Sequence, residues 1–145
     1  MFYGEYLHNI DRKGRLVLPS RFREIAKANF IEKFVLTRGL DRCLFMFSEE
    51  EWRTQEIKFK NLPFTNQQVR TFNRLYFSGA QEVSMDKQGR VLIAQFLKEY
   101  AMIKREVVIV GISNRIEIWA KEKWQEFYQN TYPSFEEIAE KLIQP

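Results

Sequence analysis

A five-residue phrase occurs twice in this chain of 145 residues, as DRKGR at 11–15 and as DKQGR at 86–90. The flanking residues match as well. When the sequence is shifted by 75 positions, residues 2–26 lie against residues 77–101, and seven of the 25 pairs are identical. Self-similarity over such a length is the mark of a duplicated structural unit, whereas a single charged turn needs no matching flanks.

A second block of similarity aligns at a shift of 72 positions, with Gly39 on Gly111 and Trp52 on Trp124. The change from 75 to 72 means that the second copy lacks three residues in a loop, where length changes are tolerated. A unit of about 50 residues buries too little surface to be stable alone, so we expect the two repeats to form one intertwined globular domain. The predicted division is a first repeat at 1–52, a helical connector at 53–76, a second repeat at 77–124 and a helical tail at 125–145.

Apolar patterning and turn residues predict short strands that alternate with short helices. The strands are expected at 5–10, 15–18, 33–37 and 43–47 in the first repeat, and at 80–85, 90–93, 106–112 and 115–119 in the second. Helices are expected at about 19–27, from 49 into the connector, from about 66 to 76, and at 94–101, 121–130 and 135–143.

Capping residues predict where these helices begin. Pro19 is expected at the first helical position, and the second repeat has Ala94 in its place, which is a weaker strand stop. Three Ser/Thr-x-x-Glu/Gln capping boxes mark other helix starts: Ser48 with Glu51, Thr65 with Gln68, and Ser134 with Glu137.

The composition allows a real core, because 45% of the residues are hydrophobic and 15% aromatic, and it argues against wholesale disorder. No apolar run approaches the roughly 20 residues of a membrane span, and the N-terminal stretch lacks the apolar segment of a signal peptide. We therefore expect a cytoplasmic protein without membrane contact. The single cysteine, Cys43, excludes an internal disulfide and a cysteine-based zinc site. It is expected to be a small buried apolar residue.

The sequence contains no arrangement typical of a metal, cofactor or nucleophile site. His8 is the only histidine, and Val83 stands at its place in the second copy. A duplicated function would not keep its catalytic histidine in one copy only, so His8 is expected to be a surface strand residue. We expect no cofactor, no metal and no small-molecule substrate.

One enzyme hypothesis concerns Asp11 and Asp86, because two-lobed aspartate hydrolases bring together one carboxylate from each lobe to share a proton. Each of these aspartates is followed four residues later by an arginine, Arg15 or Arg90. A neighbouring cation keeps a carboxylate ionised and lowers its pKa. A general acid requires the opposite, so the chain is not expected to be an enzyme.

The Asp-x-x-x-Arg spacing predicts a structural corner in each repeat. Asp11 and Asp86 can accept hydrogen bonds from turn amides or pair with the following arginine. Gly14 and Gly89 can adopt the positive φ that a tight turn requires. These four residues are therefore expected to shape two strand-turn-strand corners.

Positive charge is concentrated at these corners. The whole chain carries a net charge of +4, residues 11–23 alone carry +4 and residues 86–98 carry +2, so the remainder is net negative. Clustered lysines and arginines favour nucleic acid, because neutralising phosphates releases counterions. Arg15 and Arg90 can also form paired hydrogen bonds with guanine. The candidate DNA-binding residues are Arg12, Lys13, Arg15, Arg23, Lys87, Arg90 and Lys98.

The aromatic residues lie away from the basic turns, whereas single-strand binders interleave aromatic and basic residues. They are therefore expected in the core or at a subunit interface and not as platforms for stacked bases. This expectation covers Phe2, Trp52, Phe72, Phe77, Trp119 and Trp124.

The stretch DRKGRLVLPSRFRE resembles the AbrB/SpoVT swapped-hairpin DNA-binding domain, in which Asp-x-x-Gly-Arg precedes three apolar residues, a proline and an apolar-basic helix. Two such units in one chain, the second within YFSGAQEVSMDKQGRVLI, are similar to the MraZ family. The resemblance extends from Met1 to about Leu142. It implies a mixed α/β, mainly β fold, namely a double-split β-barrel of two interleaved repeats with connector and C-terminal helices.

The same resemblance implies a function. It implies a sequence-specific transcriptional regulator of the bacterial division and cell-wall gene cluster, which binds short direct repeats in double-stranded DNA of its own promoter. It also implies a ring-shaped homo-oligomer that is cytoplasmic and nucleoid-associated, with DNA-facing motif positions Asp11, Arg15, Asp86 and Arg90. An antitoxin-like module of the same superfamily is the alternative, and the second copy argues against it. A purely structural ring protein would need no basic cluster at the turns.

Overall fold

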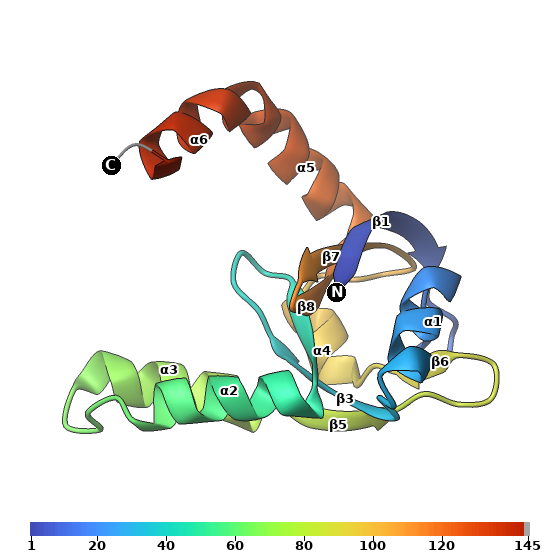
Figure 1. Ribbon diagram of the computed structural model, residues 1–145, viewed down its shortest axis with the longest axis horizontal. Helices are drawn as coiled ribbons and strands as arrows, with labels where there is room; N and C mark the ends of the chain where they lie inside the picture. The colour runs from blue at the N-terminus through green and yellow to red at the C-terminus, as the bar shows by residue number, and fades with distance from the viewer. Residues whose placement is uncertain (144–145) are drawn as a thin grey trace.

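The computed structural model describes residues 1–143 and shows a mainly β body with two helical arms, one below and one above it (Figure 1). The first repeat contains β1 (Phe2–Asn9), β2 (Arg15–Val17), α1 (Ser20–Ala28), β3 (Lys33–Arg38) and β4 (Leu44–Ser48). The lower arm consists of α2 (Glu49–Lys60) and α3 (Gln67–Ser78). The second repeat contains β5 (Gln81–Ser84), β6 (Arg90–Leu92), α4 (Gln95–Tyr100), β7 (Glu106–Ser113) and β8 (Arg115–Ala120). The upper arm consists of α5 (Lys121–Thr131), a 3₁₀ turn (Tyr132–Ser134) and α6 (Phe135–Ile143).

The strands form a six-stranded antiparallel sheet in the order β1-β7-β8-β4-β3-β5 and a separate two-stranded ribbon of β2 and β6. Strands of different repeats pair as β1 with β7, β3 with β5, β4 with β8 and β2 with β6. The two repeats are thus interleaved, and the predicted mixed α/β, mainly β fold is confirmed. Hydrogen bonds do not close the sheet into a continuous barrel, because β1 and β5 remain its edge strands.

The strand register shows approximate twofold symmetry between the repeats. In the ribbon, Leu16 pairs with Val91, which lies 75 positions later. In the sheet, Phe45 pairs with Glu117, which lies 72 positions later. These separations equal the two shifts that align the sequence with itself, so equivalent residues of the two copies face each other, as a twofold axis between them requires.

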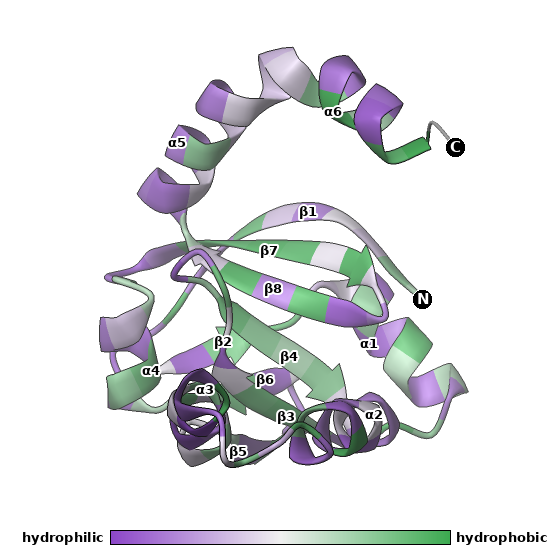
Figure 2. Cartoon of the chain, turned by 90° about the vertical axis from the view of Figure 1, so that its left-hand side faces the viewer, coloured by the Kyte–Doolittle hydropathy of each residue, from purple (hydrophilic) through white to green (hydrophobic). Residues whose placement is uncertain are grey.

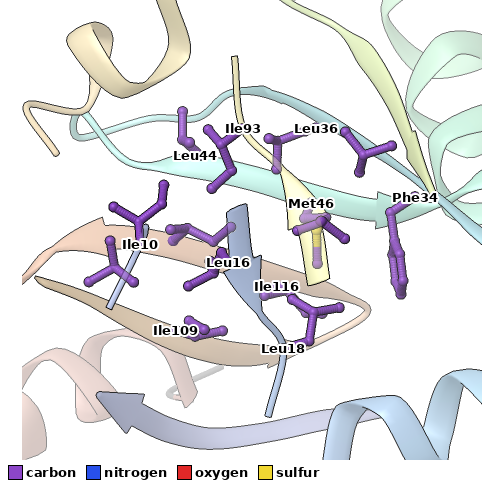
Figure 3. Close-up of a cluster of buried hydrophobic side chains, with 14 of the residues drawn as sticks. Ile10, Leu16, Leu18, Phe34, Leu36, Leu44, Met46, Ile93, Ile109 and Ile116 are labelled. Carbon is purple, nitrogen blue, oxygen red and sulfur yellow. The ribbon is translucent and has the colours of Figure 1, made fainter. Parts of the chain in front are cut away.

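The main core lies between the inner face of the ribbon and the six-stranded sheet (Figure 3). Strand geometry places alternate side chains on opposite faces, and Leu16 and Val91 point inward with 0% and 1% exposure. Leu18 and Ile93, which follow the ribbon strands, are also buried in this cluster. Both repeats contribute to this core, so neither can complete it without the other.

A second cluster, rich in aromatic residues, covers the β4–β8 region under the helical arms. Phe47 and Trp119 are buried there, with Trp52, Phe72, Phe77 and Trp124 packed against them, while Phe2 is buried in the main core. Phe2 and Trp119 are therefore core residues, while Trp52, Phe72, Phe77 and Trp124 pack on the core and stay partly exposed, in line with the expectation of core or interface positions. Cys43 is buried in the second cluster as well, and burial raises the pKa of its thiol, which keeps it protonated.

The helix starts match the sequence prediction in part. The Ser48 hydroxyl accepts a hydrogen bond from the Glu51 amide, so the first connector helix is capped as predicted. The prediction of Thr65 as the cap of α3 is wrong, because the Asn66 side chain accepts from the amides of Gln68 and Val69, the second and third residues of that helix. Asparagine is among the best N-cap residues.

Pro19 is the N-cap of α1 and not its first helical residue, since its ψ of 141° is extended and its carbonyl accepts from the Arg23 amide at 3.0 Å. Ala94 takes the same role at α4, with a ψ of 149° and an acceptor carbonyl for Lys98 at 3.1 Å. The exchange of proline for alanine therefore leaves the geometry at the start of the helix unchanged.

The repeats differ most at their first strands, since β1 has 8 residues and β5 has 4. Phe77, which aligns with Phe2 in the sequence, lies at the end of α3 and not in a strand. In the second copy, α3 thus includes residues whose counterparts in the first copy belong to β1. Within residues 1–143, no helix is both long enough and apolar enough to span a bilayer.

Candidate nucleic-acid interface

The first DRKGR turn is held together by the carboxylate of Asp11. Its Oδ1 accepts from the backbone amides of Lys13 at 2.9 Å and Arg15 at 2.8 Å, and its Oδ2 accepts from Nε of Arg15 at 2.7 Å. The backbone closes the turn with a bond from the Gly14 amide to the Asp11 carbonyl at 3.0 Å. One aspartate therefore fixes both the turn and the direction of the arginine side chain.

The second turn repeats this geometry. Asp86 accepts from the amides of Gln88 and Arg90, both at 2.9 Å, and from Nε of Arg90 at 2.7 Å. Gly89 donates to the Asp86 carbonyl at 3.0 Å. The structural corner predicted from the Asp-x-x-x-Arg spacing is thus present twice.

Each turn is also hydrogen-bonded to the residue that follows the ribbon strand of the other repeat. The Ile93 amide donates to the Gly14 carbonyl at 2.8 Å, and the Leu18 amide donates to the Gly89 carbonyl at 2.9 Å. Gly14 and Gly89 have φ angles of +83° and +77°, which glycine adopts without strain. A Cβ on Gly14 would also lie 2.8 Å from the Ile93 carbonyl oxygen, so a side chain there would push the first turn away from the end of β6.

The outer surface of the ribbon carries Arg15, Val17, Arg90 and Leu92, which we call the ribbon face. Arg15 lies opposite Leu92, and Arg90 lies opposite Val17, so the two arginines are diagonal neighbours. Such neighbours are about 7–8 Å apart. Their side chains are 33% and 27% exposed. Within residues 1–143, Nε of each arginine binds its aspartate and the terminal Nη groups have no protein partner, which leaves them open to a ligand.

The remaining predicted cations lie on the two turns and on the helices that follow the ribbon strands. Arg12, Lys13 and Lys87 are exposed on the turns, and none of them forms an ion pair within the described part of the chain. Lys98 is half-buried on α4. The turn cations thus lie beside the ribbon arginines in the chain, Arg12 and Lys13 in the same turn as Arg15, and Lys87 in the same turn as Arg90.

Arg23 has a role that the sequence did not reveal. Its Nε donates to the Leu18 carbonyl at 3.1 Å, and its side chain lies directly against Gly89 in the turn of the other repeat. The sequence placed Arg23 with the other cations because local charge was the only signal. Its contact with Gly89 depends on the pairing of the two repeats.

His8 is a half-buried residue of β1, and its Nδ1 lies 2.6 Å from the Val17 carbonyl oxygen beside the ribbon. Among residues 1–143, no group of three or more His, Cys, Asp and Glu side chains is arranged to hold a metal ion.

Electrostatics keep both turn aspartates ionised. The hydrogen bond from the Arg15 backbone amide, with those from the Arg15 side chain and the Lys13 amide, holds the pKa of Asp11 below its ordinary value of 3.8. The Arg90 amide, with the Arg90 side chain and the Gln88 amide, does the same for the pKa of Asp86. Each carboxylate is therefore held in its charged form by its own turn, the opposite of the proton-sharing pair that an aspartate hydrolase requires.

We expect the double variant Asp11→Asn/Asp86→Asn to melt at a lower temperature than the parent at neutral pH. A depressed folded-state pKa means that the charged carboxylates stabilise the folded state above the unfolded pKa, and that this contribution is lost as the pH falls through the folded value. The difference in melting temperature between parent and variant should therefore be full at pH 6–7 and shrink below about pH 3.8. Asparagine keeps the shape, so a difference that does not change with pH would show that charge is not the cause.

Comparisons with known proteins cover the whole chain. The model of the family described as "MraZ protein, putative antitoxin-like" matches residues 1–75 and again residues 76–145. A curated relative from Acetivibrio thermocellus, named transcriptional regulator MraZ, is 52% identical over 142 residues, which are 98% of this chain and 96% of the relative. A relative of the same name from Carboxydothermus hydrogenoformans is 52% identical over 143 residues, which are 99% and 97% of the two chains.

Proposed function

This chain belongs to the MraZ family, and we propose that it is a transcriptional regulator that binds double-stranded promoter DNA through the ribbon face and its two turns. The observation that carries this proposal is the paired set of Asp-braced turns, which present Arg15 and Arg90 with free Nη groups on one ribbon. A two-stranded β-ribbon fits the major groove of B-DNA, and arginine forms paired hydrogen bonds with O6 and N7 of guanine.

We assign two kinds of contact to the basic residues. Arg15 and Arg90, which are fixed by their aspartates, are proposed to read base edges. Arg12, Lys13 and Lys87, which are exposed at the turns, are proposed to bind phosphates together with Lys98 on α4. Arg23 adds its charge from a fixed position beside the second turn. Phosphate contacts set the register of a protein on DNA, whereas base contacts supply specificity.

We further propose that the chain acts as a ring-shaped homo-oligomer on short direct repeats in its own promoter, within the division and cell-wall gene cluster. The upper arm supports association between copies, because α6 stands away from the body and carries hydrophobic residues (Figure 2). Among them, Phe135 and Leu142 are 68% and 79% exposed. Linked copies bind repeated sites strongly, because each bound unit raises the effective concentration of the next. A cytoplasmic, nucleoid-associated location follows from this role.

The domain organisation supports the same proposal. We propose that the repeats at 1–52 and 77–124 form the DNA-binding body, and that the segments at 53–76 and 125–145 form the arms. The β pairings between the repeats lie in the body, while α3 and α6 extend from it (Figure 1). DNA binding and contact between copies would then use different parts of the chain.

Footprinting on the DNA upstream of the gene for this protein, repeated at several salt concentrations, tests the proposed function. We expect the logarithm of the binding constant to fall linearly with the logarithm of the salt concentration, by about 0.9 for each phosphate contacted. Lys13→Ala should reduce this slope by about 0.9 for each copy on the DNA. Lys141→Ala, an exposed change on α6, should leave it unchanged. A slope near zero for the parent would exclude binding through phosphates.

A further inference from the structure

We propose that Val17 and Leu92, the two apolar residues of the ribbon face, contact the 5-methyl groups of thymines in the major groove. The operator would then be read through thymines as well as through guanines. This inference rests on the proposed DNA-binding function and specifies which base chemistry the ribbon recognises.

The first observation is the exposure of these two side chains. Val17 is 37% exposed and Leu92 57% exposed. Their neighbours in the chain, Leu16 and Val91, are 0% and 1% exposed, because strand alternation turns them into the core. Val17 and Leu92 therefore have no part in the main core, although each lies on a strand that is anchored by it.

The second observation is their position among the arginines. Leu92 lies directly opposite Arg15, and Val17 lies directly opposite Arg90. Along either strand the arginine and the apolar residue are two positions apart, which is about 6.6 Å. This spacing is close to two base-pair steps of about 3.4 Å each. An arginine on a guanine would therefore place the apolar side chain near the edge of a base pair about two steps away.

The third observation is the chemistry that this arrangement matches. Of the four bases, only thymine presents a methyl group in the major groove, and apolar side chains contact it, while arginine binds guanine. The four side chains of the ribbon face form a rectangle in which the two arginines occupy one diagonal and the two apolar residues the other. A partner that fits this face must therefore accept cations and apolar groups in the same alternating order. A major groove with guanine and thymine edges has this pattern, whereas the phosphate backbone offers only charge.

The two apolar residues are not equivalent. Leu92 is the more exposed of the two and lies beside the first turn, with its Cδ1 3.7 Å from the position that a Cβ on Gly14 would take. Val17 is shorter, and its carbonyl oxygen lies 2.6 Å from Nδ1 of His8. We therefore expect Leu92 to provide the larger part of the methyl recognition.

The test uses two versions of the promoter fragment upstream of the gene, one with thymidine and one with deoxyuridine at every thymidine position. Uracil pairs like thymine but lacks the methyl group. The parent protein should bind the uracil duplex at least about fourfold more weakly at the same salt, the size expected from losing one buried methyl contact. Leu92→Ala should lose most of the difference between the two duplexes, Val17→Ala should lose a smaller part of it, and the double variant should bind both duplexes with equal affinity. Lys141→Ala should behave like the parent.

The outcomes separate this inference from the proposed function. If the parent binds neither duplex, the proposed function itself is wrong. If the parent binds both duplexes equally well, the chain binds DNA but thymine methyl groups are not read. If Leu92→Ala loses affinity for both duplexes and keeps the full difference between them, Leu92 serves another purpose, such as contact between copies, and the inference is overturned. Equal melting temperatures of parent and variants would confirm that these exposed changes leave the fold intact.

Discussion

Replacing both Arg15 and Arg90 by alanine should abolish measurable operator binding while the protein remains folded. Each arginine that reads a guanine contributes roughly 1–3 kcal/mol to binding, which corresponds to a loss of about 5- to 150-fold for each replacement. The two losses multiply, and they multiply again over every copy that contacts the DNA. The melting temperature should change little, because partly exposed ion pairs contribute little to stability and the Asp11 and Asp86 carboxylates keep their hydrogen bonds to the turn amides.

Gel-shift assays and thermal melting of the single and double variants check this prediction. Arg15→Lys is the matched control for charge: it keeps the cation but loses the planar fork that binds both the aspartate and guanine. It should retain weak, salt-dependent binding with reduced sequence preference, and Lys141→Ala should bind like the parent. If the double variant melts normally and still binds the promoter, the repeated turns are structural corners and another surface binds DNA.

The largest effect on stability is expected for Leu16→Ala, at about 2–5 kcal/mol. Leu16 is 0% exposed and pairs with Val91 at the approximate twofold axis, where the two repeats share their core. The change removes buried methyl groups and leaves a cavity that the surrounding sheet can fill only in part. Because a domain of this size is stable by only about 5–15 kcal/mol, such a loss is a large fraction of the total.

Chemical denaturation of Leu16→Ala and of its neighbour Val17→Ala measures this effect. Val17 is the next residue of the same strand but lies on the ribbon face, so its replacement should change the free energy of unfolding by no more than about 0.5 kcal/mol. Similar losses for the two variants would contradict the assignment of opposite faces to Leu16 and Val17.

The geometry of the turns could be predicted from the sequence because it is local. The bonds from the Arg15 amide and side chain to Asp11 span four residues, and Asp86 and Arg90 repeat them. Most strand positions and the Ser48 cap were also predictable, since each depends on neighbouring residues. The Asn66 cap was missed because Thr65 and Asn66 both qualify as caps, and the path of the chain after Pro63 decides between them.

The arrangement of the two repeats was only partly accessible from the sequence. The duplication indicated that equivalent elements exist, but pairing of β1 with β7 and of β4 with β8 depends on contacts between residues far apart in the chain. The same holds for Phe77, which matches Phe2 in the sequence but lies in α3. The helix α3 extends through Phe77, so this phenylalanine is helical although its counterpart Phe2 lies in a strand.

The sequence by itself thus determined the duplicated unit, which is visible as self-similarity along the chain. It also determined the two Asp-braced turns and the charge around them, because the turns depend on hydrogen bonds within five residues and the charge on local composition. Only the tertiary structure decided that Arg15 and Arg90 share one ribbon face with Val17 and Leu92, and that Arg23 lies against Gly89 of the other repeat. The physical reason is that alternation along a strand shows which residues share a face. Which strand lies beside it is set by how the two halves bury their common core.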